Sequence, residues 1–553
     1  MRKIFLLLNF CFIAFFSIAQ IGINTGTPWE FLKGDSLVPQ SAPVYGNLGT
    51  EAEGNRPGRR AKASTWIDGS GYLWLYGGSD ATFGGSSDLW KYDPTKNQWI
   101  FIKGNNSRNV AGVYGIKGVS DIRNNPGAGS YSATWIDNTG NFWLFGGVNK
   151  NHLWRYNPVI NEWTWMKGDN SGVAPGVYGI QGIAANQNNP GVRSGCVSWK
   201  DATGNLWLFG GSGLGASGSS GNLNDLWKYN PITNHWTWMK GDSTVGSLGV
   251  YGSLGVPHPD NKPPARNRSN SWVDASGNFW LFGGWAFEPP GTTKYFNDLW
   301  KFDPVTNQWT WMKGDSVINQ LGIYGSIGVP ASTNKPGSRN DATSWTDGAG
   351  NFWLFGGFGY SASSNGRLND LWKYNPVNNE WVWVKGDNTI NNSVVYGTQG
   401  VFAVANKPGG RGAASSWADN SGNLWLFGGI EHRGNLVELS DLWKYDTLLN
   451  QWAWIKGPNT FIIDGVYGEQ GFVSEGNHPG AREGSVMWKD GTGNLWLFGG
   501  DADTTTGVNG YKNDLWKYNS TTGQWIWMKG DSTKDNTGVY GTINITASTN
   551  KPG

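Results

Sequence analysis

The chain has 553 residues, of which 84 are Gly and 36 are Trp, and only 15% are charged. Gly is well above its usual share of about 7%, and the aromatic content of 14% excludes low-complexity disorder, which lacks aromatic side chains. The formal net charge of +2 provides no basic field, so the composition argues against nucleic acid and anionic membranes as partners.

The first 19 residues form a segment of a different kind. Arg2 and Lys3 precede an apolar run over residues 4–18, and Ser17 and Ala19 are small residues at the two positions that a signal peptidase reads. The run is shorter than the roughly 20 residues that a membrane-spanning helix needs, and no second apolar run follows. We therefore predict a signal peptide over residues 1–19, a secreted or cell-surface location, and no transmembrane segment after its removal.

The chain has two cysteines, and neither indicates a disulfide. Cys11 lies in the predicted signal peptide, where the preceding Asn9 and Phe10 do not fit a lipoprotein processing site. Cys196 is then the single cysteine of the mature chain, and its surroundings are typical of strand interior. We expect a buried and inert thiol at this position rather than a nucleophile.

From residue 20 onward the sequence repeats with a period of about 70 residues. Each unit reads Pro-Gly-x-Arg, Trp-x-Asp-x-x-Gly-Asn, Leu-Trp-Leu-Phe-Gly-Gly, Asp-Leu-Trp-Lys-Tyr-Asn-Pro and Trp-x-Trp-x-Lys-Gly-Asp, in this order and with small variations. The glycine pairs that mark the units are Gly77-Gly78, Gly146-Gly147, Gly210-Gly211, Gly283-Gly284, Gly356-Gly357, Gly428-Gly429 and Gly499-Gly500.

Each unit contains four strand signals, here called a to d. Short aromatic runs bounded by Gly, Asn, Asp and Pro are typical of strands, and no helical periodicity is present. Short turns join strand a to b and strand c to d, so each unit predicts an antiparallel four-stranded sheet. A ring of such sheets would bury both faces of each. Strand a ends near Trp66, Trp135, Trp199, Trp272, Trp345, Trp417 or Trp488.

The repeated pattern resembles the kelch motif. In the third unit it is carried by Leu208-Phe209-Gly210-Gly211, by Tyr229-Asn230-Pro231 and by Trp236. Seven copies extend the resemblance over residues 20–553, and it implies an all-β, kelch-like β-propeller of about seven four-stranded blades. The units exceed the kelch length of about 50 residues, and the excess lies in the b–c and d–a connections.

The two ends of the repeat array leave an alternative open. A d-type strand, Trp29–Asp35, precedes the first unit, and the sequence stops at Pro552-Gly553, where the next strand a should begin. We expect seven closed blades with a spare N-terminal strand. An incomplete eighth blade, or a C-terminally truncated fragment, remains as the alternative.

The topology of a propeller places the long b–c and d–a connections on one face, which is therefore the predicted functional face. The d–a connection repeats a Gly-x-Tyr-Gly signature, and we expect it to form ordered scaffold, because packing explains repetition more simply than repeated ligand contacts do. The tyrosines of this signature are Tyr114, Tyr178, Tyr251, Tyr324, Tyr396, Tyr467 and Tyr540.

The b–c connections vary, so individual binding residues are expected there. Aromatic side chains on neighbouring blades could stack on sugar rings or anchor a protein partner, and the alternative is that they pack against the long loops themselves. The candidates are Trp285, Phe287, Glu288, Tyr295 and Phe296 in blade 4, Phe358 and Tyr360 in blade 5, Glu431, His432 and Arg433 in blade 6, and Asp501 and Asp503 in blade 7.

An arginine begins strand a in six units, and Gly129 replaces it in blade 2. Because strand a is innermost in kelch-like blades, these arginines would surround the mouth of the central channel. They could hold an anion there, or tie neighbouring loops through hydrogen bonds to backbone carbonyls, which we favour. They are Arg60, Arg193, Arg266, Arg339, Arg411 and Arg482.

Catalytic and metal-binding patterns are weak. The Asp-x-x-Gly-Asn turns, such as residues 274–278, lack the alternating acidic ligands of a calcium loop, so structural calcium is only a minor possibility and no other cofactor is expected. The kelch resemblance invites comparison with galactose oxidase, but no matching histidine pair or Tyr–Cys pair is present, and no sialidase-like Tyr–Glu pair stands out.

We therefore predict an exported, non-catalytic recognition or scaffold propeller that binds an extracellular protein or a glycan through its b–c and d–a connections. An exported carbohydrate-active enzyme, oxidase-like or sialidase-like, is the alternative. The sequence does not indicate an oligomeric state.

Overall fold

The computed structural model describes most of the repeat array. The chain divides into Met1–Val38 and Pro39–Gly553, and every described residue lies in the second unit. The predicted signal peptide, the strand at Trp29–Asp35, Asp503 and Tyr540 lie outside the described residues. No helix in the described part is long and apolar enough to span a membrane. The described residues are 47–51, 55, 57–58, 60–80, 84–96, 98–105, 107–170, 173–288, 291–419, 421–433, 435–459, 464–502, 510–530 and 532.

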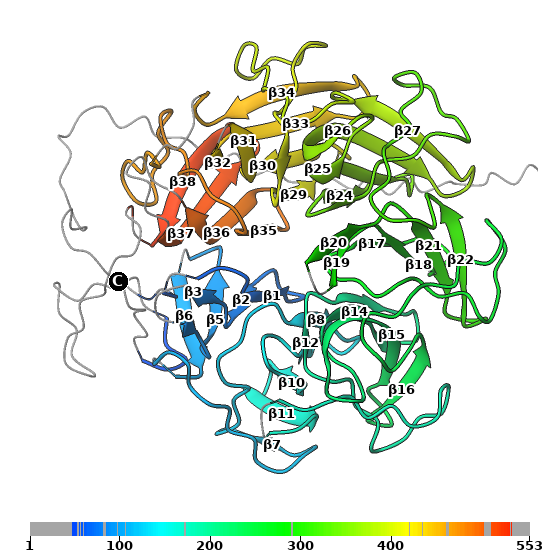
Figure 1. Ribbon diagram of the computed structural model, residues 1–553. Coiled ribbons are helices and arrows are strands. Elements are labelled where there is room, and N and C mark those ends of the chain that lie inside the picture. Colours follow the sequence, from blue (N-terminus) through cyan, green and yellow to red (C-terminus); the bar gives the residue numbers. More distant parts are fainter. Residues whose placement is uncertain are drawn as a thin grey trace, which may run out of the picture. The chain divides into compact units, whose positions relative to one another are not determined.

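Within Pro39–Gly553, seven antiparallel sheets follow one another around a closed ring, which confirms the predicted all-β propeller (Figure 1). In each blade the strands pair in the order a, b, c, d, and the a strands of successive blades approach one another at the centre. Their a, b, c and d strands are β1 (Ser64–Ile67), β2 (Leu73–Tyr76), β5 (Leu89–Asp93) and β6 (Gln98–Lys103) in blade 1; β8 (Ala133–Ile136), β9 (Phe142–Phe145), β10 (Leu153–Asn157) and β11 (Glu162–Lys167) in blade 2; β13 (Val197–Lys200), β14 (Leu206–Leu214), β15 (Ser220–Asn230) and β16 (His235–Lys240) in blade 3; β17 (Asn270–Val273), β18 (Phe279–Phe282), β21 (Leu299–Asp303) and β22 (Gln308–Lys313) in blade 4; β24 (Thr343–Thr346), β25 (Phe352–Tyr360), β26 (Asn365–Asn375) and β27 (Glu380–Lys385) in blade 5; β29 (Ser415–Ala418), β30 (Leu424–Phe427), β33 (Leu442–Asp446) and β34 (Gln451–Lys456) in blade 6; and β35 (Val486–Lys489), β36 (Leu495–Ala502), β37 (Gly510–Asn519) and β38 (Gln524–Lys529) in blade 7.

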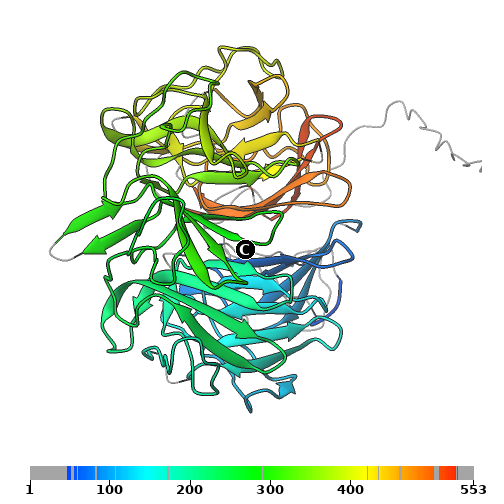
Figure 2. The same ribbon diagram turned by 90° about the vertical axis from the view of Figure 1, so that its right-hand side faces the viewer.

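The b–c connections of every blade except blade 2 contain a β-hairpin, where the sequence predicted long loops. In blades 3, 5 and 7 strands b and c continue past the glycine pair, with a register shift at the glycines. In blade 4 a separate hairpin, β19 (Trp285–Glu288) with β20 (Thr292–Tyr295), projects from the ring (Figure 2). The glycine pair forms a bulge that redirects the strand, so pairing resumes beyond it. The remaining short strands are β3 (Ser79–Asp80), β4 (Gly84–Gly85), β7 (Ser120–Asp121), β12 (Arg193–Ser194), β23 (Arg339–Asn340), β28 (Arg411–Gly412), β31 (Ile430–Arg433) and β32 (Asn435–Glu438).

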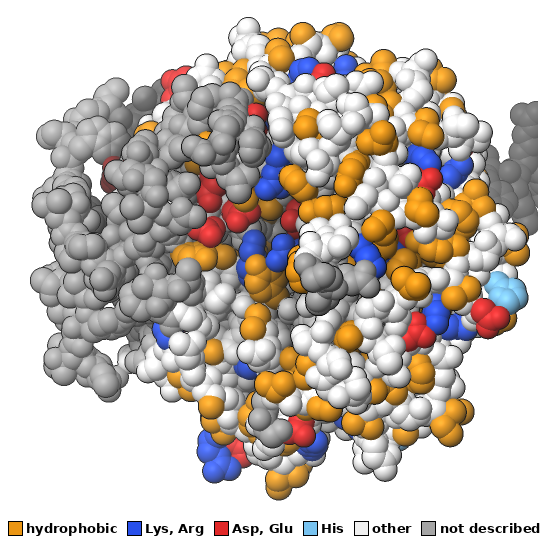
Figure 3. Space-filling view, in the orientation of Figure 1, with side chains coloured by type: hydrophobic (Ala, Val, Ile, Leu, Met, Phe, Trp, Pro, Cys, Tyr) orange, Lys and Arg blue, Asp and Glu red, His pale blue; other side chains and the backbone are white. Residues whose placement is uncertain are grey.

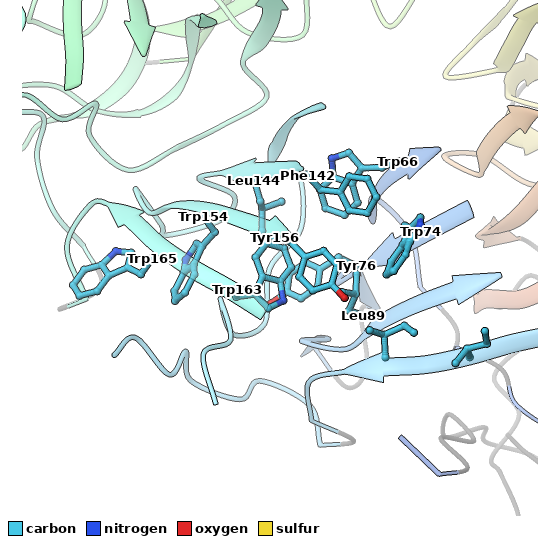
Figure 4. Close-up of a cluster of buried hydrophobic side chains, with 12 residues drawn as sticks. Trp66, Trp74, Tyr76, Leu89, Phe142, Leu144, Trp154, Tyr156, Trp163 and Trp165 are labelled. Carbon is cyan, nitrogen blue, oxygen red and sulfur yellow. The ribbon is translucent and has the colours of Figure 1, made fainter. Parts of the chain in front are cut away.

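The hydrophobic core lies between the blades rather than inside any one of them. Seven buried clusters each join residues of two adjacent blades, and one of them joins blade 7 to blade 1. In the cluster of blades 1 and 2, Trp66 stacks on Phe142 with ring centroids 5.3 Å apart (Figure 4). Because a single sheet cannot bury its aromatic faces alone, each blade depends on its neighbours for stability.

The repeated glycine pair is the backbone contact between neighbouring blades. Gly283 has φ +61°, and a Cβ atom there would lie 2.8 Å from the carbonyl oxygen of Arg339 in the next blade. The amide of Gly284 donates a hydrogen bond of 2.9 Å to the same oxygen. Only glycine provides both the left-handed backbone and the space for this approach, which explains why the pair recurs.

The d–a connection covers the outer edge of the blade that it enters. Ahead of blade 4, the amide of Gly255 donates to the carbonyl of Trp311, and the side chain of Asn261 donates to that of Trp309, at 2.7 and 3.0 Å. Equivalent bonds recur around the ring. The connection therefore satisfies backbone groups that an exposed edge strand would leave open, in line with the expected scaffold role.

The junction that closes the ring has a longer backbone hydrogen bond than the five other junctions for which the equivalent bond is described. The bond from the Gly500 amide to the Arg60 carbonyl is 3.5 Å long, against 2.9 Å for Gly284 to Arg339. A cavity of about 400 Å³ lies along blade 1 and borders both of its junctions, with Trp488 of blade 7 on one side and Trp135 of blade 2 on the other. We call this junction of blades 7 and 1 the seam.

Candidate functional site

The six arginines that begin strand a are buried in ion pairs with aspartates of strand c. Arg193 donates to both carboxylate oxygens of Asp225, at 2.6 and 2.7 Å, and to the carbonyls of Gly191 and Gly210. The two side chains are 0% exposed. The arginines therefore lie beneath the channel mouth, and their geometry does not support the anion site that the sequence left open. The other pairs are Arg60–Asp88, Arg266–Asp298, Arg339–Asp370, Arg411–Asp441 and Arg482–Asp514.

Each of these aspartates also binds residues of the repeated motif. In blade 7, Tyr467 and Trp516 donate to Oδ2 of Asp514 at 2.6 and 2.7 Å. Burial alone would raise the pKa of Asp514, but the charge and hydrogen bonds of Arg482 hold it below its ordinary value. The carboxylate therefore stays ionised, and it joins the d–a connection to strands a and c of the same blade.

Blade 2 lacks both members of this ion pair. Gly129 stands in place of the arginine and His152 in place of the aspartate. Tyr114 is the tyrosine of the d–a connection in this blade, and its hydroxyl lies 3.0 Å from Nε2 of His152. The ammonium of Lys150 enters the same space and donates to the carbonyl of Pro126 at 2.9 Å. Burial lowers the pKa of Lys150 to about 8. The paired charges of the other blades are thus replaced by a weaker polar contact.

His152 should make the stability of the ring dependent on pH. Burial, with a smaller contribution from Lys150, lowers its pKa from 6.5 to about 4, so the folded state favours the neutral ring. The contribution of this shift to the free energy of unfolding is complete above pH 6.5 and is lost as the pH falls towards 4. The total loss is roughly 3 kcal/mol. Urea unfolding at pH 7 and pH 4.5 should therefore differ more for the protein than for its His152→Gln variant. An equal difference in the two proteins would contradict this assignment.

A polar cavity of about 450 Å³ lies on the face formed by the b–c and d–a connections, which is the predicted functional face. Figure 3 shows charged side chains of both signs gathered near the centre of this face. The residues come from six of the seven blades, so the ring as a whole builds the cavity. Its lining is Ala61, Lys62, Ser79, Tyr131, Arg268, Asp341, Ala413, Glu483, Asp501 and Tyr511.

One side of the cavity combines an aromatic ring with two cations. Tyr131 is 38% exposed, and Lys62 Nζ and Arg268 Cζ lie 5.9 and 5.8 Å from its ring centroid. Arg268 also lies 3.7 Å from a carboxylate oxygen of Asp341, at the edge of ion-pair distance. Glu483 and Asp501 supply carboxylates to the same lining. A ligand in the cavity would therefore meet an aromatic face, cations and acceptors together.

Three of the predicted aromatic candidates come together beside Asp341. The ring of Tyr295 lies 5.7 Å from that of Phe358 and 6.3 Å from that of Tyr360. Burial, followed by the neighbouring Tyr360 and Asp341, raises the pKa of Tyr295. The guanidinium of Arg367 lies 5.3 Å from the Phe358 ring centroid. These aromatic side chains therefore pack partly on one another, in line with the alternative that they pack within the long connections instead of facing a ligand.

The other candidates on the b–c connections do not join this group. Phe287 is 51% exposed on the projecting hairpin, Trp285 is half-buried at its base, and Phe296 is buried beneath Arg266. Glu431 is 1% exposed, which corrects the expectation that it faces solvent as a ligand contact. Its backbone is the strand partner of Arg411 in the pairing of β28 with β31. Asp501 lines the cavity. The side chains of Glu288, His432 and Arg433 lie outside the described set.

Most of the cavity lining was missed from the sequence. Lys62, Tyr131, Arg268 and Asp341 each stand two residues after the start of the strand-a motif. That position changes from unit to unit, whereas the position two residues before it is arginine in six of the seven units, and this contrast is the signal that would have found them. No cluster of three or more His, Cys, Asp or Glu side chains suited to a metal occurs among the described residues.

Comparison with known proteins agrees with the fold. The family described as Kelch motif matches residues 277–310, which include strands b and c of blade 4. The chain is 28% identical over 166 residues to N-acetylneuraminate epimerase 2 of Escherichia coli O6:H1 and to N-acetylneuraminate epimerase of Escherichia coli O139:H28. It is 27% identical over 177 residues to N-acetylneuraminate epimerase of Shigella sonnei.

Each of these matches covers 27% of this chain and 44% of the relative, so the chain spans less than half the length of the curated relatives that it matches. The similarity concerns repeat units and does not extend over a whole relative. Taken with the seven repeated sheets and the closed ring, the motif match shows that this chain is a kelch-type β-propeller.

Proposed function

We propose that this protein is an exported, non-catalytic recognition propeller that binds an acidic sugar of a glycan in its central cavity. The observation that carries the proposal is that Tyr131 lies within 6 Å of both the Lys62 ammonium and the Arg268 guanidinium in a cavity of about 450 Å³. That volume falls within the usual range of about 300–1,000 Å³ for small-molecule sites.

The chemistry of the lining suits a sugar that carries a carboxylate. Sugar rings stack on exposed aromatic faces, and the ring of Tyr131 is the exposed aromatic face of the cavity. A guanidinium can bind a carboxylate with two parallel hydrogen bonds, and Arg268 is 44% exposed there. The carboxylate of Glu483, which lines the same cavity, would accept hydrogen bonds from hydroxyl groups of the sugar.

The relatives support the same ligand class. They are named for N-acetylneuraminate, a sugar acid, and the stretches that match them are repeat units of the same kind of ring. The predicted signal peptide supports export, where glycans of this kind would be met. A protein or glycan partner was the expectation from sequence, and the cavity favours the glycan.

Isothermal titration calorimetry tests the proposal with N-acetylneuraminate and the neutral sugar N-acetylglucosamine. We expect binding of the acid only, and a loss of about 10- to 100-fold in affinity in Arg268→Ala, because a charge-assisted hydrogen bond contributes about 1.5–3 kcal/mol. Arg123→Ala is the matched control, because Arg123 is 81% exposed on a d–a connection. Equal binding of the two sugars, or equal loss in both variants, would contradict the proposal.

A sugar-converting enzyme is the second candidate. Glu483 and Asp501 line the same cavity as Arg268, so carboxylates that could exchange protons lie near the proposed sugar, and the relatives are named epimerases. Proton NMR can follow how fast a single anomer of N-acetylneuraminate reaches equilibrium. Acceleration over buffer that Glu483→Gln abolishes would favour the enzyme and contradict a purely non-catalytic role.

A further inference from the structure

One backbone position is left-handed in all seven blades. The strand-a motif starts with the arginine, or with Gly129 in blade 2, and the left-handed residue follows this start by two positions. The φ angles there lie between +51° and +66°, a region that costs energy for every residue except glycine. The seven residues are Lys62, Tyr131, Gly195, Arg268, Asp341, Ala413 and Gly484.

Contacts between blades hold this conformation in place. The amide of Tyr131 donates to the carbonyl of Lys62 at 3.2 Å, and the amide of Arg268 donates to that of Gly195 at 3.1 Å. These bonds use only main-chain atoms, so the side chain plays no part in them. Gly195 and Gly484 show that the ring accepts glycine at this position, as the φ angle alone would favour.

All five non-glycine residues of the set line the central cavity. None is buried, and they are chemically unlike one another, whereas the position two residues before them is arginine in six of the seven blades. The glycines make room for the cations: a Cβ atom on Gly484 would collide with the ammonium of Lys62, and one on Gly195 would touch Arg268 at 3.7 Å. The pattern of side chains therefore follows the cavity, and the fold does not require it.

We infer that this left-handed position is the ligand-reading position of the ring, and that Lys62, Tyr131 and Arg268 form the subsite for the anionic group of the sugar. This deepens the proposed function and rests on it. An anionic group at the edge of the Tyr131 ring would meet both cations, since both lie within 6 Å of the ring centroid. Asp341, 3.7 Å from Arg268, is the positioning residue that limits where the guanidinium reaches.

Glycine substitution distinguishes a role of these side chains in binding the ligand from a role in supporting the fold. In Lys62→Gly, Tyr131→Gly and Arg268→Gly we expect the melting temperature to stay level or to rise by a few degrees, because the strained backbone is relieved. The affinity for N-acetylneuraminate should fall at least 10-fold in Tyr131→Gly and Arg268→Gly. Asn307→Gly is the matched control: its φ is +56°, it lies in the c–d turn of blade 4, and its affinity should not change.

The outcomes distinguish this inference from the proposed function. Melting temperatures several degrees lower in the cavity variants, but not in Asn307→Gly, would show that these side chains support the fold and would overturn the inference while leaving glycan binding intact. Unchanged affinity in all three variants would overturn it in the same way. If the unmodified protein binds neither N-acetylneuraminate nor glucuronate, the proposed function fails, and the subsite assignment fails with it.

Discussion

Asp370→Ala should lower the free energy of unfolding by about 3–5 kcal/mol. The substitution leaves the guanidinium of Arg339 buried without its carboxylate, and both side chains are 0% exposed in the ion pair. It also removes the acceptor of hydrogen bonds from Tyr324 and Trp372, at 2.7 Å each. Urea unfolding followed by tryptophan fluorescence would measure the loss.

An exposed ion pair provides the control for this experiment. Arg123 and Asp121 lie 2.8 Å apart with side chains 81% and 31% exposed, so Asp121→Ala should cost less than about 1 kcal/mol. In the double variant Arg339→Met with Asp370→Leu, part of the loss should be recovered, because no buried charge is left unpaired. Similar losses for Asp370→Ala and Asp121→Ala would show that burial of the pair is not what stabilises the blade.

Gly283→Ala should destabilise the protein by about 3 kcal/mol. A left-handed alanine alone costs about 1–2 kcal/mol, and here the added Cβ would also lie 2.8 Å from the carbonyl of Arg339 in the next blade. Either the junction of blades 4 and 5 must widen or the bond from Gly284 to Arg339 must lengthen. The shift in urea midpoint, with the slope of the transition held constant, would measure this cost.

Gly277 in the same blade separates the two contributions. Its φ is +82°, and nothing lies within 4 Å of an added Cβ atom there. Gly277→Ala should therefore show only the backbone cost of about 1–2 kcal/mol. If both alanine variants lose the same stability, the close approach between blades contributes nothing and the glycine pair needs another explanation.

The sequence predicted the ring well because its signals are local. The aromatic runs, the Asp-x-x-Gly-Asn turns and the seven-fold repetition each act within one blade, and together they indicated seven four-stranded sheets. The turn chemistry was also legible: Asp274 accepts hydrogen bonds from the amides of Ser276 and Asn278 and from the indole of Trp280. Such contacts span six residues or fewer and follow from composition and spacing.

The candidate site was predicted less well, because it depends on contacts between distant residues. The partner of Arg193 is Asp225, 32 residues away, and a propensity argument does not pair them. The joint loss of arginine and aspartate in blade 2, at Gly129 and His152, was the available signal. The cavity lining is harder still, since Tyr131 and Arg268 belong to different blades and meet only when the ring is formed.

The seam has a consequence for the order in which this protein folds. Six junctions join blades that are neighbours along the chain, so contacts there form over short sequence separations and structure can advance one blade at a time. The seam instead closes the long loop between Arg60 and Gly500, at an entropic cost of about 5 kcal/mol. Because of this cost and its longer hydrogen bond, we expect the seam to be the last junction to form and the first at which thermal motion opens the ring.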